Sequence, residues 1–555
     1  MHAAPGADEL LFLPLGGTGE VGMNLYLYGH AGRWLMVDCG IGFADERTPG
    51  IDLLLPDVGW IAERRDQLAG IVITHAHEDH IGAVAYLWDR LRCPVYGTPF
   101  TCAVLRRKLE EQGLSDEVDV IEVPIGGHFQ VGPFDLELIT VTHSILEPSS
   151  LFIRTSCGNL LHTGDWKLDP EPLVGANYDR ARLEKLASDG VLALIGDSTN
   201  AMTPGHSGSE VDVRASLKEL VGTLKNRVVM TCFATNVARL ETAAEVAKAT
   251  GRRLCLVGRS MHNIVRAAQD CGYLQNLPPL VDEREVGHLP RNEVMLLATG
   301  SQGEARSALA RVARGEHPHV VLEKDDTVIF SSRVIPGNEK AIFELQNNLV
   351  LRGVEVMTEA DHFVHVSGHP CREELLQMYQ WVRPQIAVPM HGEPRHLLAH
   401  ARLAESCQVP QTVVPSDGTL IRLTPGKPQI VDHVPVGRLA LDGANLVPSE
   451  GGAVRERRKL SFNGAAVLTL VVDPDGKLAD DPQLALFGLL GDDEAADDTV
   501  EEAIDAVEAA VERLKLNDRR RDAIVHETAR LALRRFLQRE TGRKPATEVH
   551  LVRLD

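Results

Sequence analysis

Cysteine pairs, membrane-length apolar runs and an excess of basic residues are all missing from this 555-residue sequence. Its nine cysteines are scattered without a C-x-x-C pair, which is typical of reduced thiols in a cytosolic protein and excludes a disulfide-built fold. No apolar run approaches a membrane span, and the N-terminus lacks the basic and apolar regions of a secretion signal. We therefore expect a soluble, cytoplasmic protein with no membrane partner.

The shortage of basic charge limits how this protein could bind a polyanion. It has 57 Lys and Arg against 78 Asp and Glu, a net charge of −21. Such an acidic surface should not coat nucleic acid by bulk charge, so any polyanion site must be local and built from a metal or a small basic cluster. Hydrophobic residues at 44% and charged residues at 24% are ordinary for a globular protein. At about 150 residues per domain, the length suggests three or four domains.

The order of apolar runs predicts an α/β protein in which one sheet is inserted into another. Up to about residue 200, short β-rich runs alternate with Gly-rich turns and end in Asp or His. From about 211, strands joined by helices of ten to fifteen residues predict a parallel, doubly wound sheet. The segment 384–396 then returns to the earlier style, in which a strand ends in His.

The predicted boundaries follow these changes of pattern. They are a first α/β domain in two parts (1–210 and 369–450), an inserted domain (211–368), a linker (451–464) and a small α+β C-terminal domain (465–555). In the tail, residues 473–512 are strongly acidic and 513–544 strongly basic. Such blocks are usually solvated helix faces, and a surface that touches RNA or pairs subunits is the alternative.

The strongest chemical signal is the run Thr74-His-Ala-His-Glu-Asp-His80, which follows an apolar strand. At a strand end, His75 and His77 are two residues apart and project to one side. The chain then turns into a helix whose first residues, Asp79 and His80, can face the same point. Divalent metals accept His nitrogen and carboxylate oxygen readily, and four such ligands within six residues exceed the need of one ion.

Further ligand types end other predicted strands, namely Asp38, His143, Asp165 and His391. Each of them alone could be a turn or capping residue. Together with the cluster they complete two sites that share Asp165. We assign His75, His77 and His143 to one ion, and Asp79, His80 and His391 to the other. Asp38 is expected to orient the ligands or the Asp79 loop.

Two ions about 3.5–4 Å apart lower the pKa of a shared water and hold both oxygens of a displacement at phosphorus. Hydrolysis of a phosphodiester fits this arrangement. The same centre could attack an amide, ester or thioester, so the metals alone do not name the substrate. Zinc and manganese both suit these ligands.

At this point the motifs resemble a known superfamily. H-A-H-E-D-H with Asp38, His143 and Asp165 resembles the metallo-β-lactamase fold. G-D-S-T-N (196–200) before the inserted domain, with H-V-S-G-H (365–369) and M-H-G-E (390–393) after it, resembles the β-CASP branch and is most similar to the bacterial ribonuclease J family. The resemblance implies a metallo-β-lactamase αββα sandwich, an inserted β-CASP domain with a parallel doubly wound sheet, and an α+β C-terminal domain.

The same resemblance implies a two-metal ribonuclease acting on single-stranded RNA in rRNA processing and mRNA decay. The implied activity is a 5′-to-3′ exonuclease that prefers 5′-monophosphate ends, with an endonuclease activity at the same centre. It also implies a homodimer or homotetramer assembled through the C-terminal domain, without naming other degradation partners. The alternative is a hydrolase of small esters or thioesters, which would not need an inserted domain of this size.

The resemblance also assigns roles to residues outside the ligand set. Asp79, Asp197 and His369 are the implied catalytic residues, since a His beside an acid suits proton donation to a departing alkoxide. The implied substrate-binding loop, which could form a concavity for an anion, consists of His365, Val366, Ser367, Gly368 and His369. The alternative for its two histidines is simple packing of the loop.

Two weaker assignments complete the expectations. Gly50, Asp52 and Asp442 align with positions where some relatives hold a structural calcium. Residues at strand ends or helix starts of the inserted domain could help hold RNA, with a structural role as the alternative: Phe233, Asn236, Arg239 and Arg259.

Overall fold

The computed structural model describes residues 4–335, 337–491 and 494–555. The chain divides into two compact units. The first unit comprises Met1–Gly42 and Leu55–Gly437, and the second comprises Phe43–Leu54 and Arg438–Asp555. Within the described ranges, no helix is both long and apolar enough to cross a membrane.

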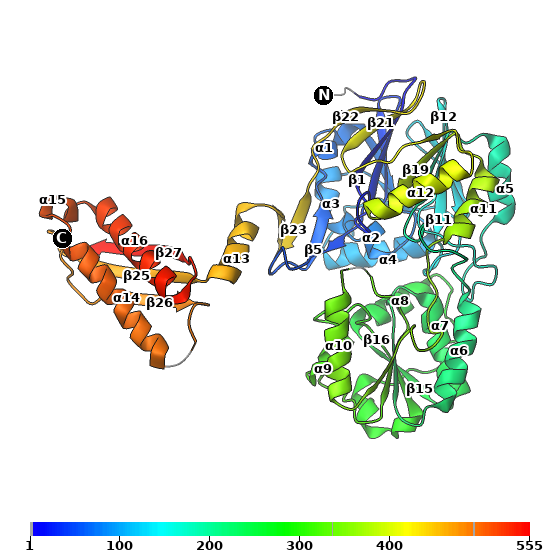
Figure 1. The fold of residues 1–555 in the computed structure, drawn as a ribbon. Coiled ribbons are helices and arrows are strands. Elements are labelled where there is room, and N and C mark those ends of the chain that lie inside the picture. The colour runs from blue at the N-terminus through cyan, green and yellow to red at the C-terminus, as the bar shows by residue number, and fades with distance from the viewer. Residues whose placement is uncertain (1–3, 336, 492–493) are drawn as a thin grey trace. The chain divides into compact units, whose positions relative to one another are not determined.

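Two large sheets form the centre of the first unit (Figure 1). The eight-stranded sheet has the spatial order β22 (Gln429–His433), β21 (Thr419–Thr424), β1 (Leu10–Gly16), β2 (Leu25–His30), β3 (Arg33–Val37), β6 (Leu68–Val72), β7 (Val95–Gly97) and β8 (Val120–Glu122). The seven-stranded sheet has the order β20 (Gln411–Thr412), β19 (Ile386–Met390), β13 (Ala193–Asp197), β12 (Gly158–His162), β11 (Ser149–Thr155), β10 (Phe134–Thr140) and β9 (His128–Val131).

The two sheets share one apolar core and carry helices on their outer faces. Phe12 and Val72 from the first sheet lie in the same buried cluster as Leu136 and Ile195 from the second. The helices of this layer are α1 (Gly59–Ala62), α3 (Val84–Leu91) and α4 (Pro99–Glu111) beside the first sheet, and α5 (Arg180–Asp189), α11 (Arg372–Val382) and α12 (Pro394–Ser406) beside the second. A 3₁₀ turn, Arg65–Gln67, precedes β6. This arrangement confirms the predicted αββα sandwich.

The inserted domain is a five-stranded sheet whose strands all pair in parallel, as predicted. Its spatial order is β15 (Arg253–Val257), β16 (Val294–Ala298), β14 (Val228–Thr231), β17 (Thr327–Phe330) and β18 (Glu355–Met357). Helices α6 (Glu210–Thr223), α7 (Val237–Ala249) and α8 (Arg259–Asp270), with α9 (Ala308–Arg314) and α10 (Glu339–Leu351), connect the strands and cover both faces (Figure 1). Two 3₁₀ segments, Glu283–His288 and Arg291–Glu293, precede β16. Strands β13 and β19 flank this insertion in sequence yet pair in parallel in the sandwich.

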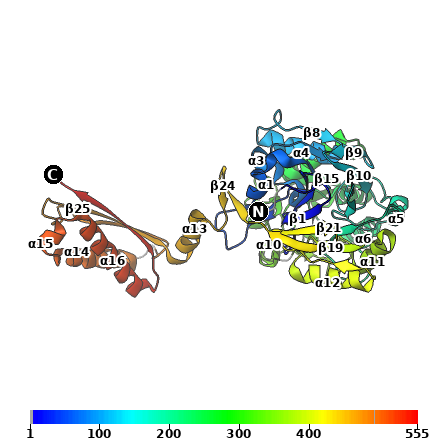
Figure 2. The ribbon, with the colours of Figure 1, turned by 90° about the horizontal axis from the view of Figure 1, so that it is seen from above.

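In the second unit, helices cover one face of a three-stranded sheet with the order β26 (Gln483–Phe487), β25 (Ala465–Val472) and β27 (Ala546–Arg553). Alternate residues of β25 are buried, and they share a core with α14 (Glu494–Glu512) and α16 (Asp522–Thr541) (Figure 2). The short helix α15 (Leu516–Arg519) lies between these two helices in the sequence. A four-stranded sheet has the order β24 (Asn445–Pro448), β23 (Arg438–Asp442), β5 (Leu53–Pro56) and β4 (Gly42–Phe43).

Two segments near the predicted linker have a fold or a place in the chain that the sequence pattern did not predict. Residues 451–464 are mostly the helix α13 (Gly452–Asn463). Residues 438–450 belong to the second unit, because β23 and β24 pair as an antiparallel hairpin there, whereas we predicted them with the sandwich. Pro and Gly are spread over residues 424–452, around these short strands, and this composition resembles that of a linker.

Candidate metal centre

The ligand-type side chains come from the ends of four strands in the two large sheets. His75 and His77 follow β6, and the short helix α2 (Glu78–Ile81) begins directly after them. Segments after β10, β12 and β19 bring His143, Asp165 and His391 to the same place. Because strand ends are held rigidly by the sheets, the ligand atoms converge although they are separated by more than 300 residues in the sequence.

The structure brings the seven predicted ligands together in two groups that share Asp165. In each group the ligand atoms lie within 4.8 Å of one another: His75, His77, His143 and Asp165 in the first group, and Asp79, His80, Asp165 and His391 in the second. A third set of the same kind, not predicted as a metal site, contains Asp165, Asp197, His369 and His391.

The spacing in the first group suits one tetrahedral ion. Nδ1 of His77 lies 3.1 Å from Nε2 of His75 and 3.0 Å from Nε2 of His143. Metal–nitrogen bonds of about 2.0–2.1 Å in a tetrahedral site would hold such nitrogens about 3.3 Å apart. Oδ2 of Asp165 completes the group at 3.8 Å from His75 and 3.7 Å from His143.

In the second group, the carboxylates of Asp79 and Asp165 face two imidazoles. Oδ2 of Asp165 lies 3.1 Å from Nε2 of His80 and 3.7 Å from Nε2 of His391. Oδ2 of Asp79 lies 3.5 Å and 3.2 Å from the same two atoms. The other oxygen of Asp165, Oδ1, is buried and has no hydrogen-bond partner among the described residues. A buried carboxylate oxygen without a partner is costly, so this donor set fits a bound cation.

Hydrogen bonds on the outer side of the rings turn their Nε2 atoms toward the centre. Nδ1 of His80 donates to Asp38 at 2.7 Å, and Nδ1 of His143 donates to the carbonyl of Gly368 at 2.5 Å. Thr199 Oγ1 lies 2.6 Å from Nδ1 of His391, which donates to it because the threonine proton goes to an Asp197 oxygen 2.8 Å away. Such partners fix the tautomer and orientation of metal-binding imidazoles.

Asp38 lies behind the ligands rather than among them. It accepts from the backbone N–H and the hydroxyl of Thr74, at 2.8 Å and 2.9 Å, in addition to His80. Its backbone has a positive φ of 62°, a strained conformation for a non-glycine residue at the end of β3. Asp38 thus ties the start of the H-A-H-E-D-H run to the imidazole of His80.

The two groups differ in protonation. Burial, followed by the neighbouring imidazoles, lowers the pKa of His75 and His143, and burial lowers the pKa of His77 to about 4. Burial alone would also lower the pKa of His80 and His391, but Asp165 and the nearby carboxylates raise both above the ordinary range. The first group is therefore neutral imidazole near neutral pH, whereas the second group carries protons when no ion is bound.

His369 and Asp197 form a separate pair beside these groups. Nδ1 of His369 donates to Asp197 Oδ2 at 2.8 Å and lies 3.8 Å from Asp165. Burial lowers the pKa of His369, but Asp197 and then Asp165 raise it above the ordinary value. The two carboxylates thus favour the protonated form of this imidazole at the edge of the centre, with Asp197 orienting it.

The rest of the predicted binding loop is buried or half-buried. Oγ of Ser367 accepts from Asn200 Nδ2 at 2.7 Å and from the N–H of His369 at 3.1 Å. Gly368 passes so close to the centre that a Cβ there would lie 2.7 Å from the His143 ring. Val366 is buried at 5% exposure, and Nδ1 of His365 is buried without a partner among the described residues.

Other predicted site residues are not brought together. Asp442 Oδ2 accepts from Arg457 Nη2 at 2.6 Å, and a Cβ at Gly50 would lie 3.8 Å from the same guanidinium. In the described part of the chain, no cluster of three His, Cys, Asp or Glu ligand atoms includes Asp52 or Asp442. Arg239, considered for RNA contact, is completely buried, whereas Phe233 is 37% exposed.

Asn24 is a residue of the centre that sequence reasoning missed. Its Nδ2 donates to the carbonyl of Asp79 at 3.0 Å and lies 3.3 Å from Asp79 Oδ2. The hydroxyl of Tyr26 donates to Asn24 Oδ1 at 2.7 Å and so fixes the amide orientation. Asn24 ends a Gly-rich stretch that reads as an ordinary turn, so no local signal identified its role.

Four family models match the chain in order along its length. They are the metallo-β-lactamase superfamily (residues 18–230), the ribonuclease J β-CASP domain (225–349), the Zn-dependent metallo-hydrolase RNA specificity domain (353–410) and the ribonuclease J C-terminal domain (452–554).

Whole-chain relatives agree with these matches. Ribonuclease J of Sinorhizobium meliloti is 43% identical over 551 residues, which cover 99% of this chain and 98% of the relative. Ribonuclease J of Thermus thermophilus is 35% identical, with 97% of this chain and 94% of the relative covered. A crystal structure of a protein of unknown function from Enterococcus faecalis has a TM-score of 0.50 at 16% identity, covers 75% of this chain and 100% of its own, and bears on the fold alone.

Proposed function

Because the chain belongs to the ribonuclease J family and is a metallo-β-lactamase-fold ribonuclease, we propose that it degrades single-stranded RNA from the 5′ end toward the 3′ end. We propose a preference for 5′-monophosphate ends and a second, internal cutting activity at the same centre. The setting is rRNA processing and mRNA decay in the cytoplasm. A homodimer or homotetramer assembled through residues 465–555 is part of the proposal.

The proposed ligands are the two groups described above, with Asp165 shared between two divalent ions, zinc or manganese. When bound, the ions would lower the pKa of a water and neutralise charge that develops on the phosphate oxygens. The buried Oδ1 of Asp165, which has no hydrogen-bond partner among the residues that the structure describes, supports this assignment, because an anionic oxygen is left to face a second cation. A calcium ion near Gly50, Asp52 and Asp442 stays a weaker proposal, since Arg457 already offers a positive charge to Asp442.

The pair of His369 and Asp197, 2.8 Å apart at the edge of the centre, is the observation that carries the proposed mechanism. Cleavage of a phosphodiester leaves an alkoxide that needs a proton. Asp197 and Asp165 raise the pKa of His369 and so favour its protonated form, from which it can donate a proton to the departing 3′ oxygen. Asp197 orients the ring and stabilises its charge before the transfer.

Ser367 supports the preference for a 5′-monophosphate. Its oxygen already accepts two hydrogen bonds, from Asn200 and from the His369 N–H, so its own proton is free to donate to a phosphate oxygen. A hydrogen bond to a charged group is worth about 1.5–3 kcal/mol. This local contact would also explain how an acidic protein retains an RNA end.

The test uses the full chain and RNA labelled at a 5′-monophosphate end. We expect release of labelled mononucleotide, slower reaction of 5′-hydroxyl RNA, cutting of circular RNA, and loss of all three with a chelator. A small ester and a thioester serve as competing substrates. Efficient ester hydrolysis without RNA cleavage would favour the alternative hydrolase, and release of nucleotides from the 3′ end would contradict the proposed direction.

A further inference from the structure

Arg239 of α7 is a completely buried arginine whose donors are all occupied. Its Nε and Nη2 contact the carboxylate of Glu210, the first residue of α6, at 2.9–3.2 Å. Its Nη1 donates to the carbonyl of Ser331 at 2.9 Å and also contacts the Ser331 hydroxyl. With no exposed surface, this side chain cannot reach RNA, so its role lies inside the protein.

The same guanidinium holds the start of the loop that carries Ser367 and His369. Nη1 of Arg239 donates to the carbonyl of Val364 at 2.9 Å, and Ser331 Oγ donates to the same carbonyl at 2.7 Å. Val364 directly precedes residues 365–369. The planar fork of arginine can therefore fix the loop and the Glu210 carboxylate at once, which the single ammonium of lysine cannot do.

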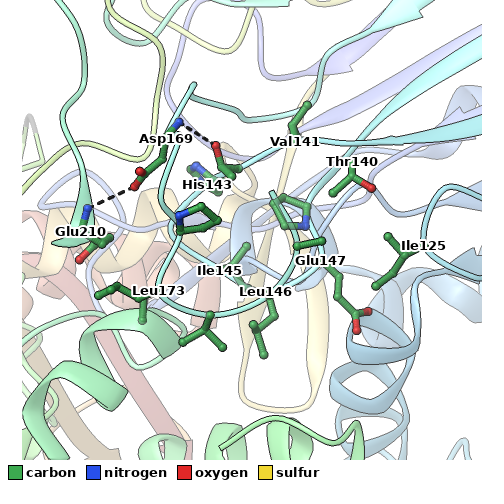
Figure 3. Close-up of a pocket in the computed structure, with 17 residues that line it drawn as sticks. Ile125, Thr140, Val141, His143, Ile145, Leu146, Glu147, Asp169, Leu173 and Glu210 are labelled. Carbon is green, nitrogen blue, oxygen red and sulfur yellow. Dashed lines mark hydrogen bonds between the residues drawn. The ribbon is translucent and has the colours of Figure 1, made fainter. Parts of the chain in front are cut away.

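Glu210, the partner of Arg239, is linked by hydrogen bonds to the segments that carry residues of the metal centre. The N–H of Glu210 donates to Asp169 Oδ2 at 3.2 Å, and the N–H of Asp169 donates to Thr142 Oγ1 at 3.0 Å, next to His143 (Figure 3). Lys167 Nζ lies 3.1 Å from Asp169 and is two residues from Asp165. Thr142, His143, Asp169 and Glu210 are among the residues that line a small pocket of about 30 Å³, which has room for no more than a water or two (Figure 3).

We propose that Arg239, through its ion pair with Glu210, is a positioning residue that sets the loop 364–369 against the segments carrying His143 and Asp165. The loop meets the centre directly, because His143 donates to the Gly368 carbonyl and His369 donates to Asp197. A buried ion pair adds little net stability compared with apolar packing, so its value here is the geometry it imposes. This inference rests on the ligand and proton-donor roles proposed above.

The test compares Arg239→Lys with Arg227→Lys in the full chain. Arg227 is also a buried arginine, at the opposite end of the same domain, where it donates to the Val321 carbonyl at 2.7 Å and faces Asp326 at 3.9 Å. Neither of its partners belongs to the centre. Both substitutions keep the charge and remove the fork, so a general loss of packing should affect the two variants alike.

Two readouts separate positioning from stability. For Arg239→Lys we expect kcat on 5′-monophosphate RNA to fall about tenfold or more, and the affinity of the ion-free protein for manganese, measured by calorimetry, to fall about tenfold, at the lower end of the usual effect of groups that orient ligands. For Arg227→Lys we expect both quantities to stay within about twofold of the parent, whatever its melting temperature.

Equal losses in both variants, or no loss in either, would overturn the positioning role. If Arg239→Lys does not fold, Ser331→Ala takes its place, because it removes one donor from the Val364 carbonyl without leaving a buried charge unpaired. It should lower kcat and manganese affinity in the same direction, and unchanged values would again refute the proposal. The manganese measurement does not require cleavage, so a parent protein without exonuclease activity would contradict the proposed function and leave this test interpretable.

Discussion

Acidification should remove the two ions of the proposed centre in a fixed order. The perturbation is a fall in pH from about 7.5 to about 5.5, during which imidazole ligands must stay neutral to bind metal. Burial keeps the pKa of His77 at about 4 and those of His75 and His143 low, so protons do not compete for the first group in this range. The nearby carboxylates raise the pKa of His80 and His391, so protons do compete for the second group.

The pKa shifts of the ligands determine how much affinity each ion loses on acidification. With a pKa of about 4, only about one His77 in a hundred is protonated at a pH near 6, so the first ion should lose almost no affinity. Below the pKa of a ligand, apparent affinity falls about tenfold per pH unit for each histidine, hence up to about 100-fold per pH unit for His80 and His391 together. We expect the second ion to be lost while the first remains bound.

The assay is equilibrium dialysis of the ion-free protein against manganese or zinc across this pH range, with metal content measured per chain. Asp38→Asn serves as a matched variant, because it removes one of the carboxylates that raise the pKa of His80 while keeping a similar shape. It should shift the loss of the second ion to lower pH. Simultaneous loss of both ions, or earlier loss of the ion bound by His75, His77 and His143, would refute the reasoning.

Three further predictions concern the shared ligand, the tail and the loop. Asp165→Ala or His80→Ala should abolish cleavage, measured as turnover, and leave RNA affinity, measured by filter binding, within a few-fold of the parent protein. Near-normal turnover would contradict the ligand assignment. A chain ending near residue 460 should sediment at a lower mass while keeping its metal content, and an unchanged mass would contradict the assembly role. Ser367→Ala should slow 5′-monophosphate RNA by about tenfold or more, the equivalent of one charge-assisted hydrogen bond, and spare circular RNA; equal slowing of both would remove the end-anchoring role.

The sheet architecture was predictable from the sequence because its signals are local. Strands such as β16 are apolar throughout, as expected for parallel strands with helices on both faces, and the connecting helices have regular lengths. The ligands at 75–80 are equally local, since strand and helix geometry alone brings them to one point. The short strands at 438–448 were not predicted because the Pro and Gly residues around them resemble those of a linker, and only the pairing of the two strands reveals them.

The contacts that orient the centre could not be read from sequence. Asn24 meets Asp79 across 55 residues, and Thr199 meets His391 across 192, so each pair exists only once the sheets have assembled. The position of Arg239 at a helix start of the inserted domain allows either RNA contact or a structural role, and the sequence does not distinguish the two. Arg239 can be buried because it forms an ion pair with Glu210, and no local sequence pattern predicts that pair.

Reconstitution of the ion-free protein tests the central claim most directly. The chain is stripped with a chelator, and manganese or zinc is added in steps while cleavage of 5′-monophosphate RNA and bound metal are measured together. We predict no cleavage without metal and a plateau when two ions are bound per chain, with Asp165→Ala inactive at every step. Cleavage by the stripped protein, or a plateau already reached with one ion, would contradict a two-ion centre that shares Asp165.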